Sequence, residues 1–325
     1  MTRRIGRILL RAVLTLLMVM SLNFILFRVV PGDPAQLLLA GARSSVTEQQ
    51  IDGLRKQWGL DRPLIPDQVV DYVSATLHGD LGYSFKFRGE RVADLLLARL
   101  PVTLALVGVA QLFAIVFGVM LGLYAGWRRG GAIDNLTTGT SLALYSTPAF
   151  WLGMLMVLVF STTLGWFPGY GAYSPTAGAG GGAGLARRPA PASRAAGGNG
   201  RARTGRAICL VARAAMSDVV TEDYMVTARA KGLTGRQMLM RHAFRNAMLP
   251  VMTLITLNLG YVVAGAITVE SVFNWPGIGG LTVEALNARD YPVLQGIFLL
   301  LGASIVIANI VADLTYGLLD PRVRQ

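Results

Sequence analysis

Few side chains in this sequence could do catalytic or metal chemistry. The chain has two histidines, His78 and His242, and a single cysteine, Cys209, which is not close to either histidine in the sequence. A zinc site needs several such ligands at short spacing, and an intramolecular disulfide needs a second cysteine. None of the three lysines lies in the G-x-x-x-x-G-K-[ST] pattern of a phosphate loop. The sequence therefore argues against metal, disulfide and ATP chemistry within this chain.

The most informative segment is the polar stretch 217–250, SDVVTEDYMVTARAKGLTGRQMLMRHAFRNAMLP. Its first part predicts a helix with Thr221 as N-cap and acidic residues in the first turn. Gly232 follows that helix where a left-handed C-cap favours glycine. Thr234 and Gln237 then match a capping box, which predicts a second helix. We expect two short helices that meet at a sharp turn at Gly232.

The first of these helices is predicted to offer small and apolar groups over which a partner's groove could close. These groups are Tyr224, Val226, Thr227, Ala228 and Ala230. Leu249 and Pro250 are expected to begin the next apolar run, which would couple the segment mechanically to the membrane. A merely solvated connection between two spans is the alternative, but the number of agreeing capping signals favours partner binding.

The composition indicates a membrane protein. Of the 325 residues, 53% are hydrophobic and 15% charged, whereas soluble domains are nearer a quarter charged. The net charge of +12 would suggest nucleic-acid binding in a soluble protein. Here the basic residues flank apolar runs, so membrane orientation explains them better.

Five apolar runs are long enough to cross a bilayer core of about 30 Å. They cover residues 12–27, 101–127, 136–167, 248–267 and 293–311. Four arginines and no acidic residue precede the first run, which predicts a cytoplasmic N-terminus. Arg128 and Arg129, which follow the second run, agree with this orientation. Residues 31–100 would then lie outside, with helices expected at 45–60, 66–77 and 92–100.

The segment 178–206 does not fit this arrangement. It contains nine Gly, eight Ala and six Arg, which is typical of a flexible linker and not of a membrane span. With five spans, the arginine-rich stretch 213–245 would fall outside, whereas a sixth span between residues 173 and 213 would restore the charge pattern. Because Gly, Ala, Arg and Pro have GC-rich codons, and 27 of the 30 basic residues are Arg, we hypothesise an out-of-frame segment that returns to frame near residues 207–211.

Several motifs resemble one transporter family. The sequences TARAKGL at 227–233 and RHAFRNAMLP at 241–250 resemble the EAA-type signature of binding-protein-dependent ABC importer permeases, in its dipeptide, oligopeptide and nickel form. Further matches follow in order along almost the whole chain. They are PGDP at 31–34, GLDRP at 59–63, GDLG at 79–82, RLPVT at 99–103, WPGIG at 275–279 and RDYPV at 289–293.

The resemblance implies an all-α polytopic membrane protein with the six-span fold of type I ABC importer permeases, in which the Gly/Ala/Arg-rich segment takes the place of the fourth span. Residues 1–30 would form the cytoplasmic N-terminus and first span, and 31–100 an extracytoplasmic segment. Residues 101–325 would form the permease core, with a cytoplasmic coupling loop at 217–247. The chain would reside in the plasma or inner membrane, where it would translocate di- or oligopeptides.

The resemblance also implies partners. These are a second homologous permease, two ATP-binding subunits that hold ATP and Mg, and an extracytoplasmic substrate-binding protein. This chain itself would be no enzyme and would hold no cofactor or metal. The residues implied to couple it to the ATPase are Glu222, Asp223, Tyr224, Thr227, Ala228, Arg229, Ala230, Lys231, Gly232, Leu233 and His242.

Other readings remain open at this point. The same transporter class could carry nickel, haem, glutathione or another small solute, and the chain could be a non-functional variant without a fourth span. A membrane enzyme would need a compact acid, base or nucleophile cluster, which the sequence does not offer. A binder of nucleic acid or anionic lipid would use the basic loops and show a steep dependence on salt.

Overall fold

The computed structural model describes residues 2–29, 52, 63–87, 89–166, 192–260 and 266–319. These residues are helical apart from turns and one isolated bridge between Tyr83 and Arg91, which confirms the all-helical class. The helix predicted at 45–60 lies outside the described residues, apart from Asp52. The chain divides into two compact units, which are described separately: residues 2–100 with 281–306, and residues 101–280 with 307–325.

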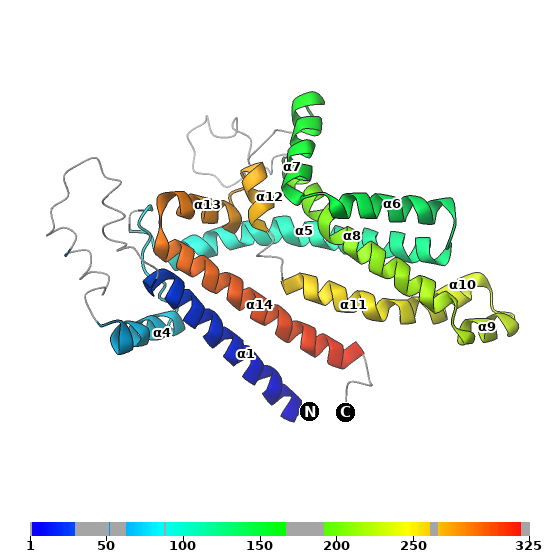
Figure 1. The fold of residues 1–325 in the computed structure, drawn as a ribbon, viewed down its shortest axis with the longest axis horizontal. Coiled ribbons are helices and arrows are strands. Elements are labelled where there is room, and N and C mark those ends of the chain that lie inside the picture. Colours follow the sequence, from blue (N-terminus) through cyan, green and yellow to red (C-terminus); the bar gives the residue numbers. More distant parts are fainter. Residues whose placement is uncertain are drawn as a thin grey trace, which may run out of the picture. The chain divides into compact units, whose positions relative to one another are not determined.

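The elements follow one another as a series of helices, labelled in Figure 1. They are α1 (Thr2–Phe24) with a π-helical end at Ile25–Val29, a π-helical segment at Leu64–Gln68, α4 (Val69–Leu77), α5 (Val92–Trp127), α6 (Ala132–Ser146), α7 (Ala149–Val157) with a π-helical end at Leu158–Thr163, α8 (Ala192–Val220), α9 (Asp223–Ala230), α10 (Gly235–Met238) with a π-helical segment at Leu239–Ala243, α11 (Phe244–Gly260), α12 (Ala266–Phe273), α13 (Ile278–Ala288) and α14 (Tyr291–Leu319). The predicted helices at 66–77 and 92–100 are both confirmed, and the latter continues through Pro101 into α5 without a break.

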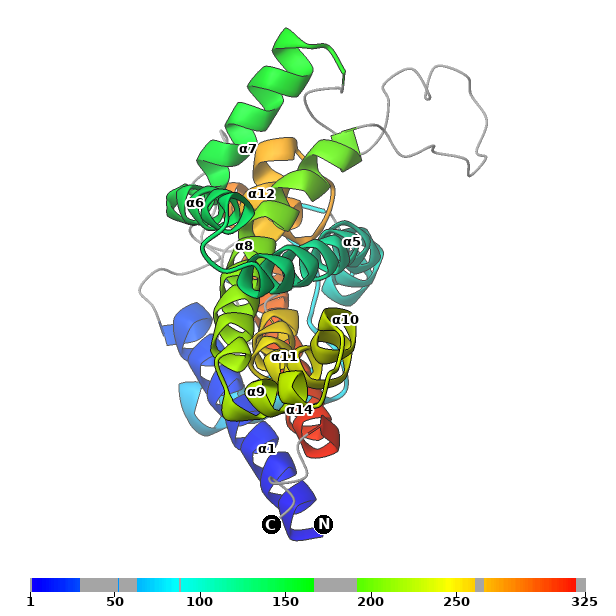
Figure 2. The ribbon, with the colours of Figure 1, turned by 90° about the vertical axis from the view of Figure 1, so that its right-hand side faces the viewer.

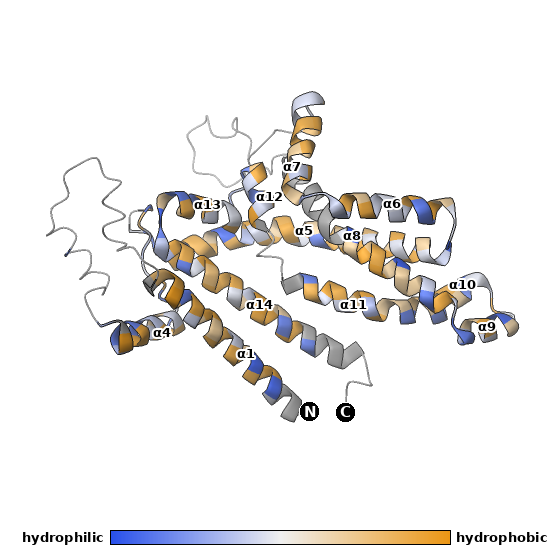
Figure 3. Ribbon diagram, viewed as in Figure 1, coloured by the Kyte–Doolittle hydropathy of each residue, from blue (hydrophilic) through white to orange (hydrophobic). Residues whose placement is uncertain are grey.

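Within the described residues, three helices are long and apolar enough to cross a membrane: Gly6–Phe27, Val92–Trp127 and Tyr291–Val311. They confirm the first, second and last of the five predicted runs, and Figure 3 shows apolar residues along nearly the whole of α5. Of the predicted run 248–267, residues 248–260 belong to α11 and residues 266 and 267 begin α12, whereas residues 261–265 are not described. Pro250 lies inside α11, which begins six residues earlier than expected, at Phe244.

The third predicted run is broken and not continuous. Helices α6 and α7 meet at 101°, and the pair counts at most as one bent span. Thr147 between them is extended, with ψ at 126°, because the ring of Pro148 disfavours the helical conformation of the residue before it. Pro148 then precedes the first turn of α7, where its missing N–H costs no hydrogen bond.

The first unit combines α1, α4 and the adjoining parts of α5, α13 and α14. Asn23 donates from Nδ2 to the carbonyl of Gln295 at 3.0 Å, which joins α1 to α14. A Cβ at Gly302 would lie 2.4 Å from Val19 Cγ1, so glycine is needed where these two helices touch. Ser84 Oγ donates to Asp290 at 2.5 Å, and Lys86 pairs with Glu284 at 3.0 Å, so the turn before α5 is bonded to the segment before α14.

The second unit is organised by close contact between α5 and α8, which lie side by side in Figures 1 and 2. Three glycines of α5 make this possible, because a Cβ on any of them would lie within 2.3–2.7 Å of an α8 carbonyl oxygen. The contacts pair Gly118 with Gly205, Gly122 with Cys209 and Gly126 with Arg213. Both series advance by four residues in the same direction, so α5 and α8 are parallel. Such small-residue stripes let helix backbones approach closely in membranes.

Candidate functional site

The predicted helix–turn–helix is present, as α9, the turn at Gly232 and α10, which we call the elbow. Its N-cap, however, is Glu222 and not Thr221. The backbone at Glu222 is extended, whereas Thr221 closes the end of α8 by donating from Oγ1 to the carbonyl of Asp218 at 2.8 Å. Glu222 makes no side-chain cap bond, but Asp223 places an acidic group at the positive end of the helix dipole.

The turn itself is a complete Schellman motif. Gly232 has a φ of +75°, the left-handed conformation that glycine adopts without a Cβ clash. Its N–H donates to the carbonyl of Arg229 at 3.0 Å, and the N–H of Leu233 donates to Ala228 at 3.3 Å. These two bonds satisfy carbonyls at the end of α9 that would otherwise be unpaired. The glycine C-cap predicted from the sequence is confirmed.

The capping box of α10 is also confirmed. The N–H of Thr234 donates to Gln237 Oε1 at 2.9 Å, and the N–H of Gln237 donates to Thr234 Oγ1 at 3.4 Å. The helix that starts here does not stop at Met238. It continues through the π-helical segment Leu239–Ala243 into α11, so the second arm of the elbow and α11 form one continuous helical run.

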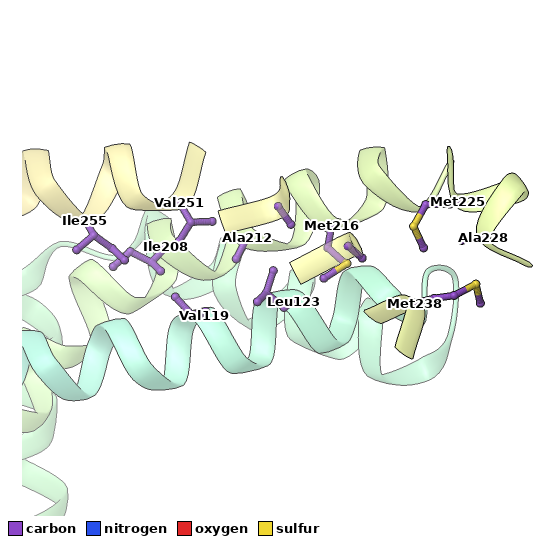
Figure 4. Packing of buried hydrophobic residues seen from close by; sticks show 12 residues of the cluster. Val119, Leu123, Ile208, Ala212, Met216, Met225, Ala228, Met238, Val251 and Ile255 are labelled. Atoms are coloured by element: carbon purple, nitrogen blue, oxygen red, sulfur yellow. The ribbon is translucent and has the colours of Figure 1, made fainter. Parts of the chain in front are cut away.

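The inner face of the elbow packs into the core of its unit. Met225 and Ala228 of α9 and Met238 of α10 are at most 6% exposed and join a cluster with Met216 of α8 and Ala247 of α11 (Figure 4). Ala228, which was expected to be offered to a partner, is 4% exposed and packs within its own unit, and its role in coupling stays a prediction.

The outer face of the elbow is exposed. Val226 is 65% exposed and Tyr224 37%, and the other predicted coupling residues on this face are Glu222, Asp223, Thr227, Arg229, Ala230, Lys231 and Gly232. Leu233 and His242 are half-buried, and Leu233 packs against the core cluster. The face thus combines apolar groups with charges of both signs, as in a rim around a protein contact.

One residue of this site was missed by the sequence reasoning. Asn246, in the first turn of α11, donates from Nδ2 to the hydroxyl oxygen of Tyr224 at 2.9 Å, which bonds the two arms across the turn. The signal that could have found it is the RNA tripeptide at 245–247, which was noted only as part of a motif. The bond fixes the exposed ring of Tyr224 relative to α11.

A buried ion pair holds α8 just before it enters the elbow. Arg213 donates from Nε to Asp134 Oδ1 at 2.5 Å and from Nη2 to Oδ2 at 3.0 Å, while the N–H of Gly130 donates to the same carboxylate at 2.9 Å. Asp134 is 1% exposed. Two-point binding of a carboxylate by guanidinium is strong and directional. The pair therefore joins α8 to α6 and to the turn between α5 and α6.

The position of the elbow within its unit follows from these contacts. Because α5 and α8 are parallel, the end of α8 lies beside the end of α5 at Trp127, and the Arg213–Asp134 pair confirms this independently. The elbow and the Arg128–Arg129 turn therefore lie at the same end of the unit. This is the arrangement expected if both face the same side of a membrane.

An apolar helical bundle with a polar, doubly capped elbow at one end is the architecture of a membrane permease subunit that works with partner proteins. Family comparison agrees: residues 1–107 match the N-terminal membrane component, and residues 207–325 the inner membrane component, of binding-protein-dependent transport systems. The chain belongs to this family. It is a non-catalytic, multi-pass inner membrane subunit of an ABC importer, a family without cofactors, whose ATPase and binding protein are separate partners.

Individual relatives support the assignment. A protein of Brucella suis biovar 1 (strain 1330), provisionally named a peptide permease, is 38% identical over 95% of both chains. The glutathione transport system permease protein GsiC of Escherichia coli (strain K12) is also 38% identical, again over 95% of each chain. Among solved structures, the MetNI methionine ABC transporter in inward-facing conformations matches 70% of this chain and 96% of its own, with a TM-score of 0.54 at 18% identity, which shows a similar fold.

Proposed function

We propose that this chain forms part of the membrane pathway of an ATP-driven importer for di- or oligopeptides. It would pair with a second homologous permease, and two ATP-binding subunits would dock on the elbow. The observation that carries the proposal is the elbow itself: α9 is buried on one face, exposed on the other, and continuous through α10 with the membrane-directed helix α11.

The elbow suits force transmission because both of its ends are fixed. The Schellman turn and the capping box set the angle between its arms, and the Arg213–Asp134 pair fixes the helix that enters it. Closure of the ATPase subunits would displace the outer face of α9, and the rigid arms would pass this displacement to α8 and α11. Alternating access requires such rigid elements that switch between two packings.

Short peptides are the substrate class that the relatives favour. One relative is provisionally named a peptide permease and the other a glutathione permease, and glutathione is itself a tripeptide. Glutathione is therefore the second candidate substrate, ahead of nickel, haem or other small solutes. The two are separated by uptake into proteoliposomes that contain the assembled transporter and its binding protein: radiolabelled dipeptides and glutathione are supplied in turn, each in competition with the other.

We further propose six membrane crossings with a cytoplasmic N-terminus, and α8 as the fourth crossing. The parallel arrangement of α5 and α8 supports this count, because two parallel helices cross in the same direction and an odd number of crossings must separate them. The part of α8 from Gly205 onward packs against α5, whereas the sequence before it carries arginines at 194, 201 and 203. The family match resumes at residue 207, which supports a return to the reading frame there.

Two experiments test these proposals. A single cysteine at Thr234, with Cys209 replaced, should react with a membrane-impermeant thiol reagent only after cells are lysed, since Thr234 is exposed. Labelling of intact cells would contradict a cytoplasmic elbow and would leave a non-functional variant as the better reading. Resequencing the coding DNA tests the frame: if no pair of compensating frame changes yields an apolar segment before residue 207, the frame hypothesis fails.

A further inference from the structure

A fully buried carboxylate lies in the unit formed by residues 101–280 and 307–325, at the end opposite the elbow. Glu270 of α12 is 0% exposed and accepts three hydrogen bonds, one from the Thr103 hydroxyl at 2.7 Å and two from the N–H groups of Gly279 and Gly280 at 2.6 and 3.2 Å. Thr103, also 0% exposed, accepts from the N–H of Ile278 at 2.8 Å. We call Glu270, Thr103 and the backbone of residues 277–280 the Glu270 network.

The two glycines of the WPGIG motif allow close approach, Gly277 to this carboxylate and Gly279 chiefly to the backbone of α12. A Cβ at Gly277 would lie 2.3 Å from Glu270 Oε1 and 2.4 Å from Thr103 Oγ1, and a Cβ at Gly279 would lie 2.5 Å from the Cα of Ile267. The backbone therefore wraps the carboxylate at van der Waals contact, at the start of α13, where N–H groups favour an anion. Helix α5 and the contiguous segment 266–280, which comprises α12 and the 274–280 turn, therefore meet at one side chain.

The need to hold these segments together does not by itself explain a buried carboxylate. An apolar cluster of Leu106, Val269, Phe273 and Trp275 already packs these segments together. Replacing a buried charge by a well-packed apolar group is often neutral or stabilising, because desolvation of the charge offsets its bonds. The hydrogen bonds of the carboxylate are directional, whereas apolar contacts are not. They therefore fix the orientation of the 274–280 turn relative to α5.

The network is placed to act on the whole of α5. From Thr103 to Gly126, which contacts α8 beside the elbow, the helix rises about 35 Å at 1.5 Å per residue, or about one bilayer core. A rigid helix of this length connects the Glu270 network at one end with the α8 contact at the other. A change imposed on α12 and the 274–280 turn would therefore reach the elbow end through α5.

We propose that Glu270 is a positioning residue of the transport cycle, which makes α12, the 274–280 turn and α5 move as one body when a loaded substrate-binding protein docks outside. The inference rests on the proposed import function and on the proposed orientation, which puts α12 on the outer side. It assigns to Glu270 and Thr103 the transmission of the docking signal, and not the binding of substrate.

The test uses the assembled transporter in proteoliposomes and measures ATP hydrolysis against the concentration of peptide-loaded binding protein. Thr103→Val and Glu270→Gln remove donors or acceptors at nearly constant size, whereas Thr103→Ser keeps the hydroxyl and is the matched control. We expect the maximum stimulation to fall at least about fivefold in the first two variants, since about fivefold is the factor for a single net hydrogen bond. The half-saturating concentration and the rate without binding protein should stay at the wild-type values, and Thr103→Ser should behave as wild type.

The outcomes separate this inference from the function on which it rests. If the wild-type complex is not stimulated by peptide-loaded binding protein, the proposed peptide function fails. If the wild type is stimulated and Thr103→Val and Glu270→Gln are stimulated equally well, the network is only packing and the inference is overturned. A raised half-saturating concentration with an unchanged maximum would also overturn it, because the network would then belong to the docking surface.

A second measurement applies if the variants fail to assemble. Spin labels at Leu104, which is 44% exposed, and at exposed Ser271 report the distance between α5 and α12, with Cys209 replaced and the network intact. We expect one narrow distance distribution that is the same with and without docked binding protein. A shift or broadening on docking would show that α12 moves independently of α5, which contradicts the proposal.

Discussion

The elbow and the Glu270 network are both polar structures at the ends of an apolar bundle, yet they are built in opposite ways. The elbow is held by local bonds: its Schellman turn and capping box join residues three to five positions apart. The Glu270 network combines bonds between residues 9 and 10 positions apart with bonds between residues 167 and 175 positions apart, through a carboxylate and a hydroxyl that are completely buried. The elbow is a turn whose angle is set by backbone capping and whose outer face is exposed, whereas the Glu270 network is a buried joint made by tertiary contact.

The difference teaches where each region is vulnerable. Local caps form and break with a single turn of helix, so damage to the elbow should remain local. A buried polar network shares its groups among several segments, so the loss of one member leaves others unpaired in a low-dielectric site. Glycines illustrate the contrast: Gly277 is required by space, Gly232 by its backbone conformation, and Gly235 by neither.

The largest loss of stability should follow from breaking the buried pair that leads into the elbow. Arg213→Ala leaves Asp134 buried without its guanidinium, which we expect to destabilise the unit by roughly 3 kcal/mol, at the low end for buried pairs because Arg213 is 30% exposed. Thermal unfolding of the purified subunit in detergent measures this. Exposed Arg236→Ala is the matched control and should unfold at the wild-type temperature, whereas an equal loss in both variants would contradict the assignment.

Gly277→Ala tests the space at the Glu270 network. The new methyl group would clash with both Glu270 and Thr103, and such overpacking costs about 1–3 kcal/mol. The unfolding temperature should therefore fall. Gly235→Ala is the control: its new Cβ meets nothing within 4 Å, so the unfolding temperature should stay unchanged or rise slightly. If Gly277→Ala is as stable as the wild type, the carboxylate is not wrapped as tightly as the structure shows.

Gly232→Ala tests the backbone at the elbow without any clash, since a Cβ there also meets nothing within 4 Å. Its φ of +75° should make the substitution cost about 1–2 kcal/mol through conformation alone. The loss should be confined to α9 and α10, where amide hydrogen exchange measured by mass spectrometry should quicken, with α5 and α12 unchanged. Faster exchange throughout the unit would show that the elbow is not a local structure.

The same contrast explains what could be predicted from the sequence. The capping roles of Gly232, Thr234 and Gln237 could be predicted, because capping depends on neighbours in the chain. The partners of Asp134 and Glu270 could not be predicted, because nothing local indicates which residue 79 or 167 positions away will meet a carboxylate. Thr221 was misplaced as N-cap by one residue for a different reason: its hydroxyl bonds backward to the carbonyl of Asp218 at the end of α8, and this local competition is not revealed by the sequence pattern.

Thr234→Ala should have the smallest effect and gives the sharpest test of the local character of the elbow. It removes the hydroxyl that accepts from the N–H of Gln237, a cap whose loss costs about 1 kcal/mol. Because α10 continues into α11, the remaining helix should stay intact, and only the amides of residues 235–238 should exchange faster. Thr234→Ser keeps the oxygen and should exchange as the wild type does. Thr234→Ala should not lower the unfolding temperature of the whole unit by as much as Gly277→Ala does: an equal shift would show that the elbow is coupled to the core as strongly as the Glu270 network, and the distinction between a locally capped turn and a buried joint would fail.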